Sequence, residues 1–294
     1  MNILITGANG FIGRRLVRRL ADDGHSVIAV DRMASRKDLP AGARHVVSDF
    51  ADASTALCVE KKPFALAHLA WEMDRSRDQS GQAERFGRFL EECAARGLVR
   101  VVALGSSEEF GSRGGVIRDE DEPVPPVTPY GAAKRAARST LQLFSEKHNI
   151  PALWLRPFTV YGPGQRGSMM IPYAVSCARS RIPAQFTDGL QSRDFVYVDD
   201  VVDALAKAVL SAQEGFVEMN IGSGCAVRVR DVLGLIAEAM NARGLFNIGA
   251  LPRRPGEPEI QQADIHAAEK LLNWHPVTTL RAGIAETCAA AGGL

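Results

Sequence analysis

Length, composition and charge set the first limits on what this chain can be. Its 294 residues are 46% hydrophobic and 23% charged, which is ordinary for a soluble globular protein of two lobes or one large α/β domain with an attachment. The formal net charge of +1 gives no electrostatic case for a nucleic-acid or membrane-surface partner. No apolar run has the length of a membrane span, no signal peptide is visible, and the five cysteines are scattered, so we expect a cytoplasmic protein.

The first half of the chain alternates short apolar segments with helical patterns. A helix is expected over Phe11–Asp22, and another near Ala83–Arg96 after a polar loop that begins at Glu72. Continuous apolar strands that alternate with helices predict an α/β fold, a Rossmann-type doubly wound parallel sheet. The expected strands are Asn2–Thr6, Ser26–Val30, Arg44–Ser48, Phe64–Ala70, Val99–Leu104 and Ala152–Leu155.

Glycine and proline interrupt the chain after Tyr161-Gly162-Pro163-Gly164, where its character changes. We predict a dinucleotide-binding domain of residues 1–162 and 193–222, with a smaller, interleaved substrate lobe of residues 163–192 and 223–294. The elements expected in this half are a strand over Asp194–Val198, a helix over Asp200–Leu210 with Asp199 or Asp200 as its N-cap, a strand over Met219–Ile221 and a helix over Asp231–Met240.

A glycine turn joins the first predicted strand to the first predicted helix. Gly7, Gly10 and Gly13 have the spacing G-x-x-G-x-x-G and enclose Phe11 and Ile12. Glycine lets the backbone approach a pyrophosphate without a Cβ clash, and a helix N-terminus offers free N–H groups and the positive end of its dipole. Since the strand–turn–helix context is the one that such a site needs, the turn predicts dinucleotide binding.

The second predicted strand leads directly into an acidic residue. Asp31 follows Gly13 by 18 positions and is expected to accept hydrogen bonds from the adenosine ribose hydroxyls. A carboxylate there repels a 2′-phosphate, so Asp31 favours NAD. The adjacent Arg32 could pair with such a phosphate, which leaves NADP open.

A tyrosine and a lysine four residues apart form the candidate reactive pair. Tyr130 and Lys134 follow Pro129, which suits the first turn of a helix, and residues at i and i+4 share a helix face. An ammonium group beside a phenol lowers the phenol pKa from about 10 towards neutrality. Such a tyrosine can exchange a proton with a substrate oxygen while a nicotinamide exchanges hydride. A hydroxyl from the serine-rich strand end Gly105–Gly111 could hydrogen-bond the same oxygen.

Taken together, the motifs resemble the extended short-chain dehydrogenase/reductases, specifically the NAD-dependent epimerase/dehydratase family of nucleotide-sugar enzymes. The resemblance covers most of the chain. It rests on Thr6–Gly13, Asp31, Asp49-Phe50, His68–Ala70, Ser106-Ser107, Pro129–Lys134, Leu155–Pro157, Tyr161–Pro163, Gln191–Asp200, Asn220–Gly224 and Arg254–Gly256.

The resemblance implies roles for individual residues. Tyr130 would be the general acid/base, Lys134 its pKa partner and a ribose ligand, and Ser106 the catalytic serine. Arg193 and Arg254 would hold the diphosphate and ribose of a nucleotide sugar, because guanidinium groups suit bidentate phosphate contacts. The residues implied around the cofactor are Asp49 and Phe50 at the adenine, the backbone of Leu69 and Ala70, and Pro157 near the nicotinamide.

The chain departs from the family pattern next to Ser106. The family often has Val-Tyr-Gly where this chain has Glu109-Phe110-Gly111. Relatives that dehydrate sugars carry an acidic pair after the Ser/Thr, whereas here the first position is Ser107 and only Glu108 remains. This argues against 4,6-dehydration and leaves Ser107 and Glu108 as candidate substrate contacts, with Glu108 a possible second acid/base.

Several functions remain compatible with these residues. The first hypothesis is an epimerase or oxidoreductase that moves hydride at a sugar carbon, most readily C4, of a nucleotide-linked hexose. The alternatives are a nucleotide-sugar 4-ketoreductase that consumes NAD(P)H and a reductase of a non-sugar carbonyl. A non-catalytic NAD(P) sensor would be expected to lack the Tyr–Lys pair. The histidines have no metal spacing, so no metal site is predicted, and the resemblance implies a homodimer.

Overall fold

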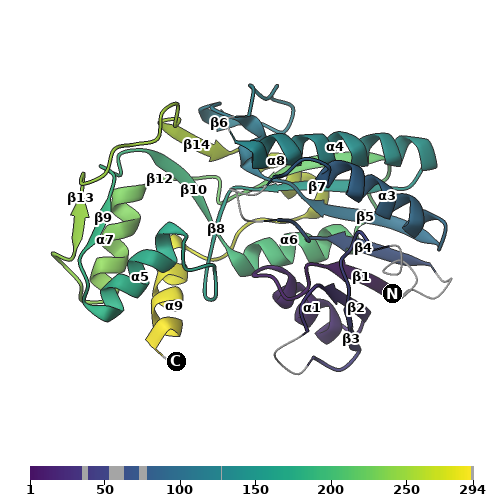
Figure 1. Ribbon diagram of the computed structural model, residues 1–294, viewed down its shortest axis with the longest axis horizontal. Helices are drawn as coiled ribbons and strands as arrows, with labels where there is room; N and C mark the ends of the chain where they lie inside the picture. Colours follow the sequence, from purple (N-terminus) through teal and green to yellow (C-terminus); the bar gives the residue numbers. More distant parts are fainter. Residues whose placement is uncertain (35–38, 53–62, 73–77, 127, 293–294) are drawn as a thin grey trace.

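A seven-stranded parallel sheet forms the larger lobe of the computed structural model, which describes residues 1–34, 39–52, 63–72, 78–126 and 128–292 (Figure 1). Its strand order is β11-β7-β5-β4-β1-β2-β3, in which the chain runs outward to β3 and then returns across β1. That reversal is the doubly wound arrangement predicted from the sequence. The strands are β1 (Asn2–Thr6), β2 (Ser26–Asp31), β3 (Ala43–Val47), β4 (Phe64–His68), β5 (Leu98–Leu104), β7 (Ala152–Pro157) and β11 (Phe216–Ile221).

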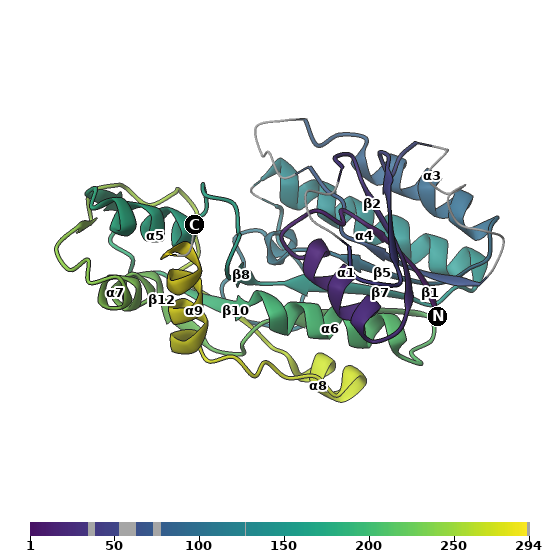
Figure 2. The same ribbon diagram turned by 90° about the horizontal axis from the view of Figure 1, so that it is seen from below.

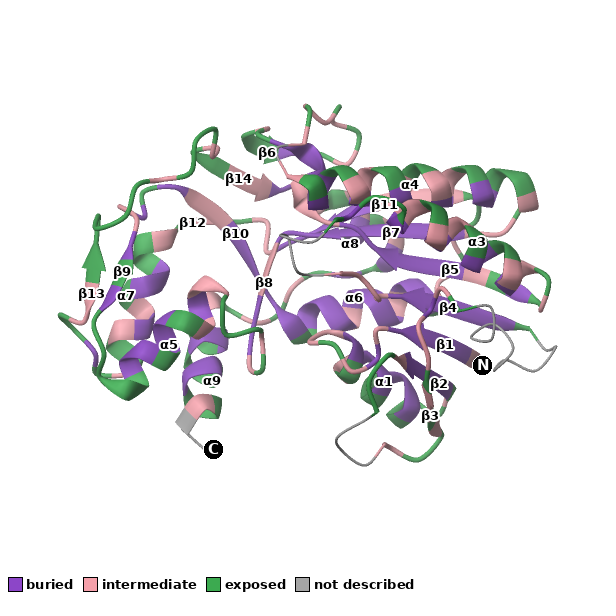
Figure 3. Cartoon of the chain, viewed as in Figure 1, coloured by how far each residue is buried: buried purple, intermediate pink, exposed green. Residues whose placement is uncertain are grey.

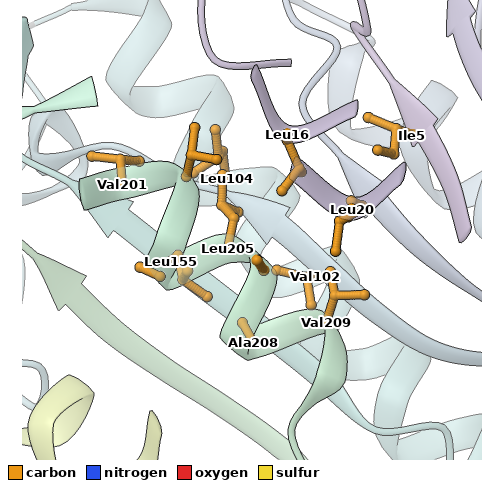
Figure 4. Close-up of a cluster of buried hydrophobic side chains, with 14 of the residues drawn as sticks. Ile5, Leu16, Leu20, Val102, Leu104, Leu155, Val201, Leu205, Ala208 and Val209 are labelled. Carbon is orange, nitrogen blue, oxygen red and sulfur yellow. The ribbon is translucent and has the colours of Figure 1, made fainter. Parts of the chain in front are cut away.

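Helices cover both faces of this sheet because successive strand residues point to opposite sides. Ile3 and Ile5 of β1 join a core cluster with α1, α6 and α8, while Leu4 joins a second cluster with α3 and α4. Figure 2 shows α6 and α8 on one side of the sheet and α3 and α4 on the other, and Figure 4 shows part of the first cluster. The helices are α1 (Gly13–Asp22), α3 (Gln82–Ala94), α4 (Pro129–His148), α6 (Val198–Leu210) and α8 (His266–Leu272).

A smaller lobe lies beside the carboxyl ends of the strands (Figure 1). Its core packs α5 (Met170–Ser180), α7 (Val229–Ala239) and α9 (Leu280–Gly292) around buried aromatic and aliphatic side chains. Strands β9 (Ala184–Phe186) and β13 (Phe246–Ile248) pair at its edge. Figure 3 shows buried residues along the central strands of the large sheet and on the facing sides of these helices.

A five-stranded sheet connects the two lobes. It has the order β12-β10-β14-β6, and β8 also pairs with β10. Strands from both predicted domains therefore share one sheet, and the exact division of the chain stays a prediction. The strands are β6 (Gly115–Ile117), β8 (Thr159–Tyr161), β10 (Ser192–Tyr197), β12 (Ala226–Arg228) and β14 (Ile260–Ala263).

The predicted N-cap of the helix after β10 is wrong. Tyr197 occupies the N-cap of α6 and makes no side-chain capping bond. Asp200 lies inside the first turn, and its carboxylate accepts hydrogen bonds from the backbone amides of Val277 and Thr278. The aspartate therefore binds a distant segment of the chain, which local sequence cannot indicate.

Two further expectations can be placed against the structure. The polar loop predicted after Glu72 leads into α3, although residues 73–77 of it lie outside the described residues. Within the described part of the chain, no helix combines the length and apolar character needed to span a bilayer.

Candidate active site

The glycine turn between β1 and α1 is packed backbone against backbone. Gly7 has a φ of 69°, and a Cβ atom placed on it would lie 2.7 Å from the amide nitrogen of Ala70. A Cβ atom on Gly13 would lie 2.1 Å from the carbonyl oxygen of Gly7. Only glycine fits these two positions, so the turn holds α1 close to the carboxyl end of β1.

The N-terminus of α1 is open to a ligand that can accept hydrogen bonds. Ile12 is its N-cap residue, and no side chain caps the first turn. Phe11 lies beside it under the guanidinium of Arg15, whose carbon is 5.4 Å from the ring centroid. The positive end of the helix dipole therefore points out of the glycine turn without an internal acceptor from a side chain, which fits a pyrophosphate.

Asp31 lies at the end of β2 beside the turn. Its carboxylate accepts hydrogen bonds from the amides of Asn9, at 3.0 Å, and Met33, at 3.2 Å. Arg32 is largely exposed and lies 4.0 Å from the carboxylate of Glu72. The Asp31 carboxylate is thus fixed beside the glycine turn, and Arg32 lies at the outer limit of ion-pair distance from Glu72.

The residues expected around adenine and nicotinamide line neighbouring strand ends. The carboxylate of Asp49 pairs with Arg85 at 3.0 Å, and the buried ring of Phe50 packs edge-on against His68 with centroids 4.8 Å apart. Leu69 and Ala70 donate their amides to the backbone and side-chain oxygens of Thr6, respectively. Pro157 is buried at the end of β7.

The first turn of α4 carries the Tyr–Lys pair into the interior. Thr128 caps the helix by accepting a hydrogen bond from the amide of Gly131 at 3.0 Å. Tyr130 is 6% exposed and Lys134 is 3% exposed. The Lys134 ammonium donates to the carbonyl oxygen of Leu104 at 2.7 Å and lies 3.8 Å from the ring centroid of Trp71 and 5.9 Å from that of Tyr130. The pair therefore lies at the carboxyl end of β5.

Ser106 begins the 3₁₀ turn η1 (Ser107–Phe110), which packs against that same helix turn. Its hydroxyl oxygen accepts a hydrogen bond from the amide of Glu108. The Glu108 carboxylate accepts from the Thr128 hydroxyl at 2.9 Å, and a Cβ on Gly131 would lie 2.5 Å from the Glu108 carbonyl oxygen. Glu108 therefore supports the start of α4, and Ser107 is half-buried on the same turn.

Glu109 is a buried carboxylate whose place in the site the sequence did not indicate. It is 2% exposed and accepts hydrogen bonds from the amide of Ser106, at 2.7 Å, and from the indole of Trp154, at 3.1 Å. Burial raises the pKa of Glu109 and lowers the pKa of Lys134. Two adjacent glutamates after a strand are typical of a solvated turn; the only signal was their departure from the family's Val-Tyr-Gly pattern.

A chain of contacts links the glycine turn to the Tyr–Lys pair. Gly7 touches Ala70, the residue before Trp71, and Lys134 lies over the Trp71 ring. Lys134 in turn is hydrogen-bonded to Leu104, which precedes the Ser106 turn. The glycine turn and the Tyr–Lys pair are therefore neighbours across the carboxyl edge of one sheet, as required of a site that juxtaposes a dinucleotide and an acid/base.

The two predicted diphosphate ligands lie in the connecting sheet and the loop next to it. Arg193 on β10 pairs with Glu257 at 2.7 Å and donates to the carbonyl oxygen of Pro258 at 2.9 Å. Arg254 is exposed in the loop that carries Glu257. Both arginines therefore adjoin the loop of residues 253–258. Arg254 is part of that loop, and Arg193 is bonded to Glu257 and Pro258 in it. Among the described residues, no group of three or more His, Cys, Asp or Glu side chains is arranged to hold a metal ion.

Comparisons with known proteins agree with this geometry. The profile of the "NAD dependent epimerase/dehydratase family" matches residues 3–222. A UDP-glucose 4-epimerase of Mycolicibacterium smegmatis is 32% identical, over 98% of this chain and 97% of that protein. A dTDP-6-deoxy-L-talose 4-dehydrogenase (NAD(P)(+)) of Kitasatospora kifunensis is 29% identical, over 97% and 93%. The structure of MoeE5 in complex with UDP-glucuronic acid and NAD superposes with a TM-score of 0.88 at 32% identity and 99% coverage of both chains.

Proposed function

We propose that this chain, which belongs to the NAD-dependent epimerase/dehydratase family and is an enzyme, is an NAD-dependent 4-epimerase of a nucleotide sugar. The observation that carries the proposal is the buried Tyr130–Lys134 pair beside the glycine turn. A relative named as a UDP-glucose 4-epimerase, aligned over nearly its whole length, supports the reaction class.

The residues that would hold NAD are those of the glycine turn and the strand ends around it. Gly7, Gly10 and Gly13 allow the tight turn that would present the N-terminus of α1 to the pyrophosphate, and Asp31 would bind the ribose hydroxyls. NAD is favoured over NADP because the Asp31 carboxylate, fixed beside the turn, would repel a 2′-phosphate. When bound, NAD supplies reversible hydride transfer at the sugar carbon.

The side chains of α4 and η1 would handle the proton. Tyr130 would take the proton of the C4 hydroxyl on its phenolate oxygen as the carbon is oxidised, and return it when the carbon is reduced from the opposite face. The Lys134 ammonium would stabilise the phenolate, and the Ser106 hydroxyl would donate a hydrogen bond to the same substrate oxygen. The proton is conserved over the cycle, so no external acid or base is consumed.

Arg193 and Arg254 would bind the diphosphate that links sugar to nucleoside. The carbonyl oxygens and the carboxylate around Arg193 hold its guanidinium in place, which suits a bidentate contact with a phosphate. Ser107 and Glu108 lie on the turn next to Ser106 and would contact the sugar. A nucleoside diphosphate sugar therefore remains the proposed substrate class, with the individual sugar open.

A 4-ketoreductase of a nucleotide sugar is the second candidate. It would use the same residues, and the similarity to a protein named as a deoxytalose 4-dehydrogenase favours it over a reductase of non-sugar carbonyls. The two candidates differ in stoichiometry: a reductase consumes one NAD(P)H per turnover, whereas an epimerase consumes none.

An experiment with a panel of substrates separates these possibilities. The protein is incubated with UDP-, dTDP- and CDP-linked hexoses and hexuronates, and products are followed by chromatography and NADH absorbance. We expect interconversion of C4 epimers without net NADH change, and a loss of at least about 100-fold in Tyr130→Phe. Tyr173→Phe, which changes a partly exposed tyrosine on α5, is the matched control. Full activity in Tyr130→Phe would refute the assignment, and turnover only with added NAD(P)H and a 4-keto sugar would select the reductase.

The assembly state and the compartment are separate proposals. We expect a homodimer joined through the face that includes α4, because the resemblance to the family implies this interface. Light scattering after size exclusion tests it, with a mass of twice 31.7 kDa expected and the monomer mass contradicting it. The cytoplasmic location also stays a prediction, which localisation of a tagged chain would test.

A further inference from the structure

The carboxylate of Glu109 lies directly behind the proposed catalytic residues. It caps the Ser106 turn through the Ser106 amide and is held on its other side by the Trp154 indole. Gly105 leaves no spare room there, since a Cβ on it would lie 2.5 Å from a Glu109 carboxylate oxygen. The carboxylate is therefore fixed in position and shielded from water at the end of β5, to which Lys134 is also hydrogen-bonded.

Burial of the Lys134 ammonium costs free energy, and the Glu109 carboxylate offsets part of this cost. An ammonium group with 3% exposure, bonded to one carbonyl oxygen and lying over an aromatic ring, loses most of its hydration. Burial lowers the pKa of Lys134, and the negative charge of Glu109 opposes this shift. A neutral amine would not stabilise a phenolate, so a negative charge that opposes this shift favours the proposed chemistry. The ammonium in turn opposes the burial that raises the pKa of Glu109.

We propose that Glu109 is a positioning residue that keeps Lys134 protonated and anchors the Ser106 turn, so that the ammonium remains available to Tyr130. The benefit to Tyr130 rests on the proposed function, whereas the coupling between the buried charges of Glu109 and Lys134 does not depend on it. Glu109 itself contacts neither Tyr130 nor the proposed substrate site through any hydrogen bond described above, so it acts through Lys134 and Ser106.

Other charged groups around the pair do not replace Glu109. Arg138, on α4, is paired with Glu218 at 2.8 Å. Arg156, on β7, donates to the carbonyl oxygen of Asp119 and lies 3.5 Å from the Glu218 carboxylate, although its charge also lowers the pKa of Glu109. His68, on β4, faces Lys134 but stays neutral, because burial lowers its pKa to about 3. Among the residues that the structure describes, Glu109 is thus the carboxylate whose charge raises the pKa of Lys134.

A lysine titration tests the coupling without any substrate. The chain has seven lysines, so the ¹⁵Nζ resonance of Lys134 can be assigned by comparison with Lys134→Arg. Glu109→Gln keeps a carbonyl oxygen for the Ser106 amide and the Trp154 indole but removes the charge. We expect this variant to lower the Lys134 pKa by about one unit or more. Glu109→Asp should hold the pKa closer to the wild-type value, and Glu108→Gln, on the same turn, should leave it unchanged.

The pH dependence of turnover provides a second readout once a substrate is identified. In Glu109→Gln the basic limb of the kcat profile should move to lower pH while KM changes little, because loss of the Lys134 proton occurs earlier. An unchanged Lys134 pKa in folded Glu109→Gln overturns the proposal, whether or not the protein is an epimerase. Conversely, a shifted Lys134 pKa with no turnover on any nucleotide sugar would refute only the proposed function.

A reciprocal measurement covers the case in which Glu109→Gln fails to fold. Linkage requires that Lys134→Met raise the pKa of Glu109 by as much as Glu109 raises that of Lys134. The Glu109 carboxyl can be followed by ¹³C-glutamate NMR, with Glu109→Asp used for assignment. A rise of about one unit supports the coupling, and a Glu109 pKa that does not respond to Lys134→Met contradicts it.

Discussion

Three buried titratable side chains lie at the carboxyl edge of the large sheet. Lys134, Glu109 and His68 are each at most 3% exposed, so their protonation depends on one another and on burial more than on solvent. A hydrogen bond of 2.8 Å joins Nδ1 of His68 to the hydroxyl oxygen of Thr6, and the His68 ring stacks on Phe86 with ring centroids 4.3 Å apart. His68 therefore fills the end of β4 as a neutral ring, beside Thr6, the residue before the glycine turn.

The neutrality of His68 makes a prediction about stability and pH. Burial, aided by the charge of Lys134, lowers the pKa of His68 to about 3, whereas an unfolded histidine titrates near 6.5. Between these values the unfolded chain binds the extra proton, so this contribution is complete above pH 6.5 and is lost at about 1.4 kcal/mol per pH unit as the pH falls.

Replacement of His68 by Gln removes that proton uptake. The difference in unfolding free energy between wild type and His68→Gln should therefore shrink as the pH falls from 7 to 5. Urea unfolding at pH 7, 6 and 5 measures it. A difference that stays constant over this range would show that His68 titrates normally in the folded protein.

The two arginines near the small lobe should separate binding from stability. Arg254 is exposed, so Arg254→Ala should leave the melting temperature unchanged and raise KM for a nucleotide sugar about tenfold or more. Arg193 is 14% exposed and braces the loop through Glu257, so Arg193→Ala should raise KM and also lower stability. Unchanged KM in both variants would indicate a substrate without a diphosphate.

Elements of the larger lobe followed from sequence more fully than those of the smaller one. Continuous apolar segments gave β1 with its exact bounds and placed β2, β4, β5 and β7 within a few residues, because each is buried on both faces. The short strands β6, β8, β12 and β14 were not predicted. They have only three or four residues each, and their pairing partners lie far away in sequence, so no local periodicity marks them.

The candidate site shows the same division between local and distant information. The glycine turn and the Tyr–Lys pair are local motifs, and the structure brings them together through Ala70 and Trp71. The hydrogen bond between Glu109 and Trp154 depends on the packing of η1 against β7. Asp200 of α6 binds a segment more than 70 residues away. These contacts exist only in the folded chain and leave no spacing to detect.

The turn between β1 and α1 gives a prediction for a single methyl group. A Cβ on Gly13 would meet backbone at 2.1 Å, so Gly13→Ala must displace α1 from β1. We expect loss of NAD retention, measured by mass spectrometry of the native protein, together with a lower melting temperature. Gly234→Ala in the exposed face of α7 is the control: its Cβ meets nothing within 4 Å, and it should stabilise the protein by about 0.5–1 kcal/mol. Normal NAD retention in Gly13→Ala would contradict the site.

The molecule as a whole is tied together by its C-terminal segment. After β14, α8 packs on the large sheet and α9 packs in the small lobe. The segment between them, which includes Trp274, contacts the first turn of α6. The Trp274 indole donates to the carbonyl oxygen of Asp200 at 3.0 Å, and the Asp200 carboxylate accepts two backbone amides at 3.1 Å each. Because these hydrogen bonds fix the segment that connects the two lobes to α6, we expect the two lobes to unfold together.

Asp200→Ala tests this connection. Two hydrogen bonds to a buried carboxylate are removed, so the free energy of unfolding should fall by about 3 kcal/mol or more. Asp199→Ala, at the neighbouring position, removes an exposed ion pair with Arg15 and should cost less than about 1 kcal/mol. Chemical denaturation of both variants measures the difference. Equal effects would show that Asp200 does not anchor the C-terminal segment.

The proposed reaction is tested most directly with a nucleotide sugar labelled at the reacting carbon. UDP-glucose with deuterium at C4 is incubated with the holoenzyme in ordinary water, and the product is examined by NMR and mass spectrometry. Transfer to NAD and back within one cycle predicts a C4 epimer that retains the deuterium, with no free NADH formed. If another nucleotide sugar is the better substrate in the panel, the same label is placed in that compound. A C4 epimer that has exchanged its deuterium for solvent hydrogen would contradict the account.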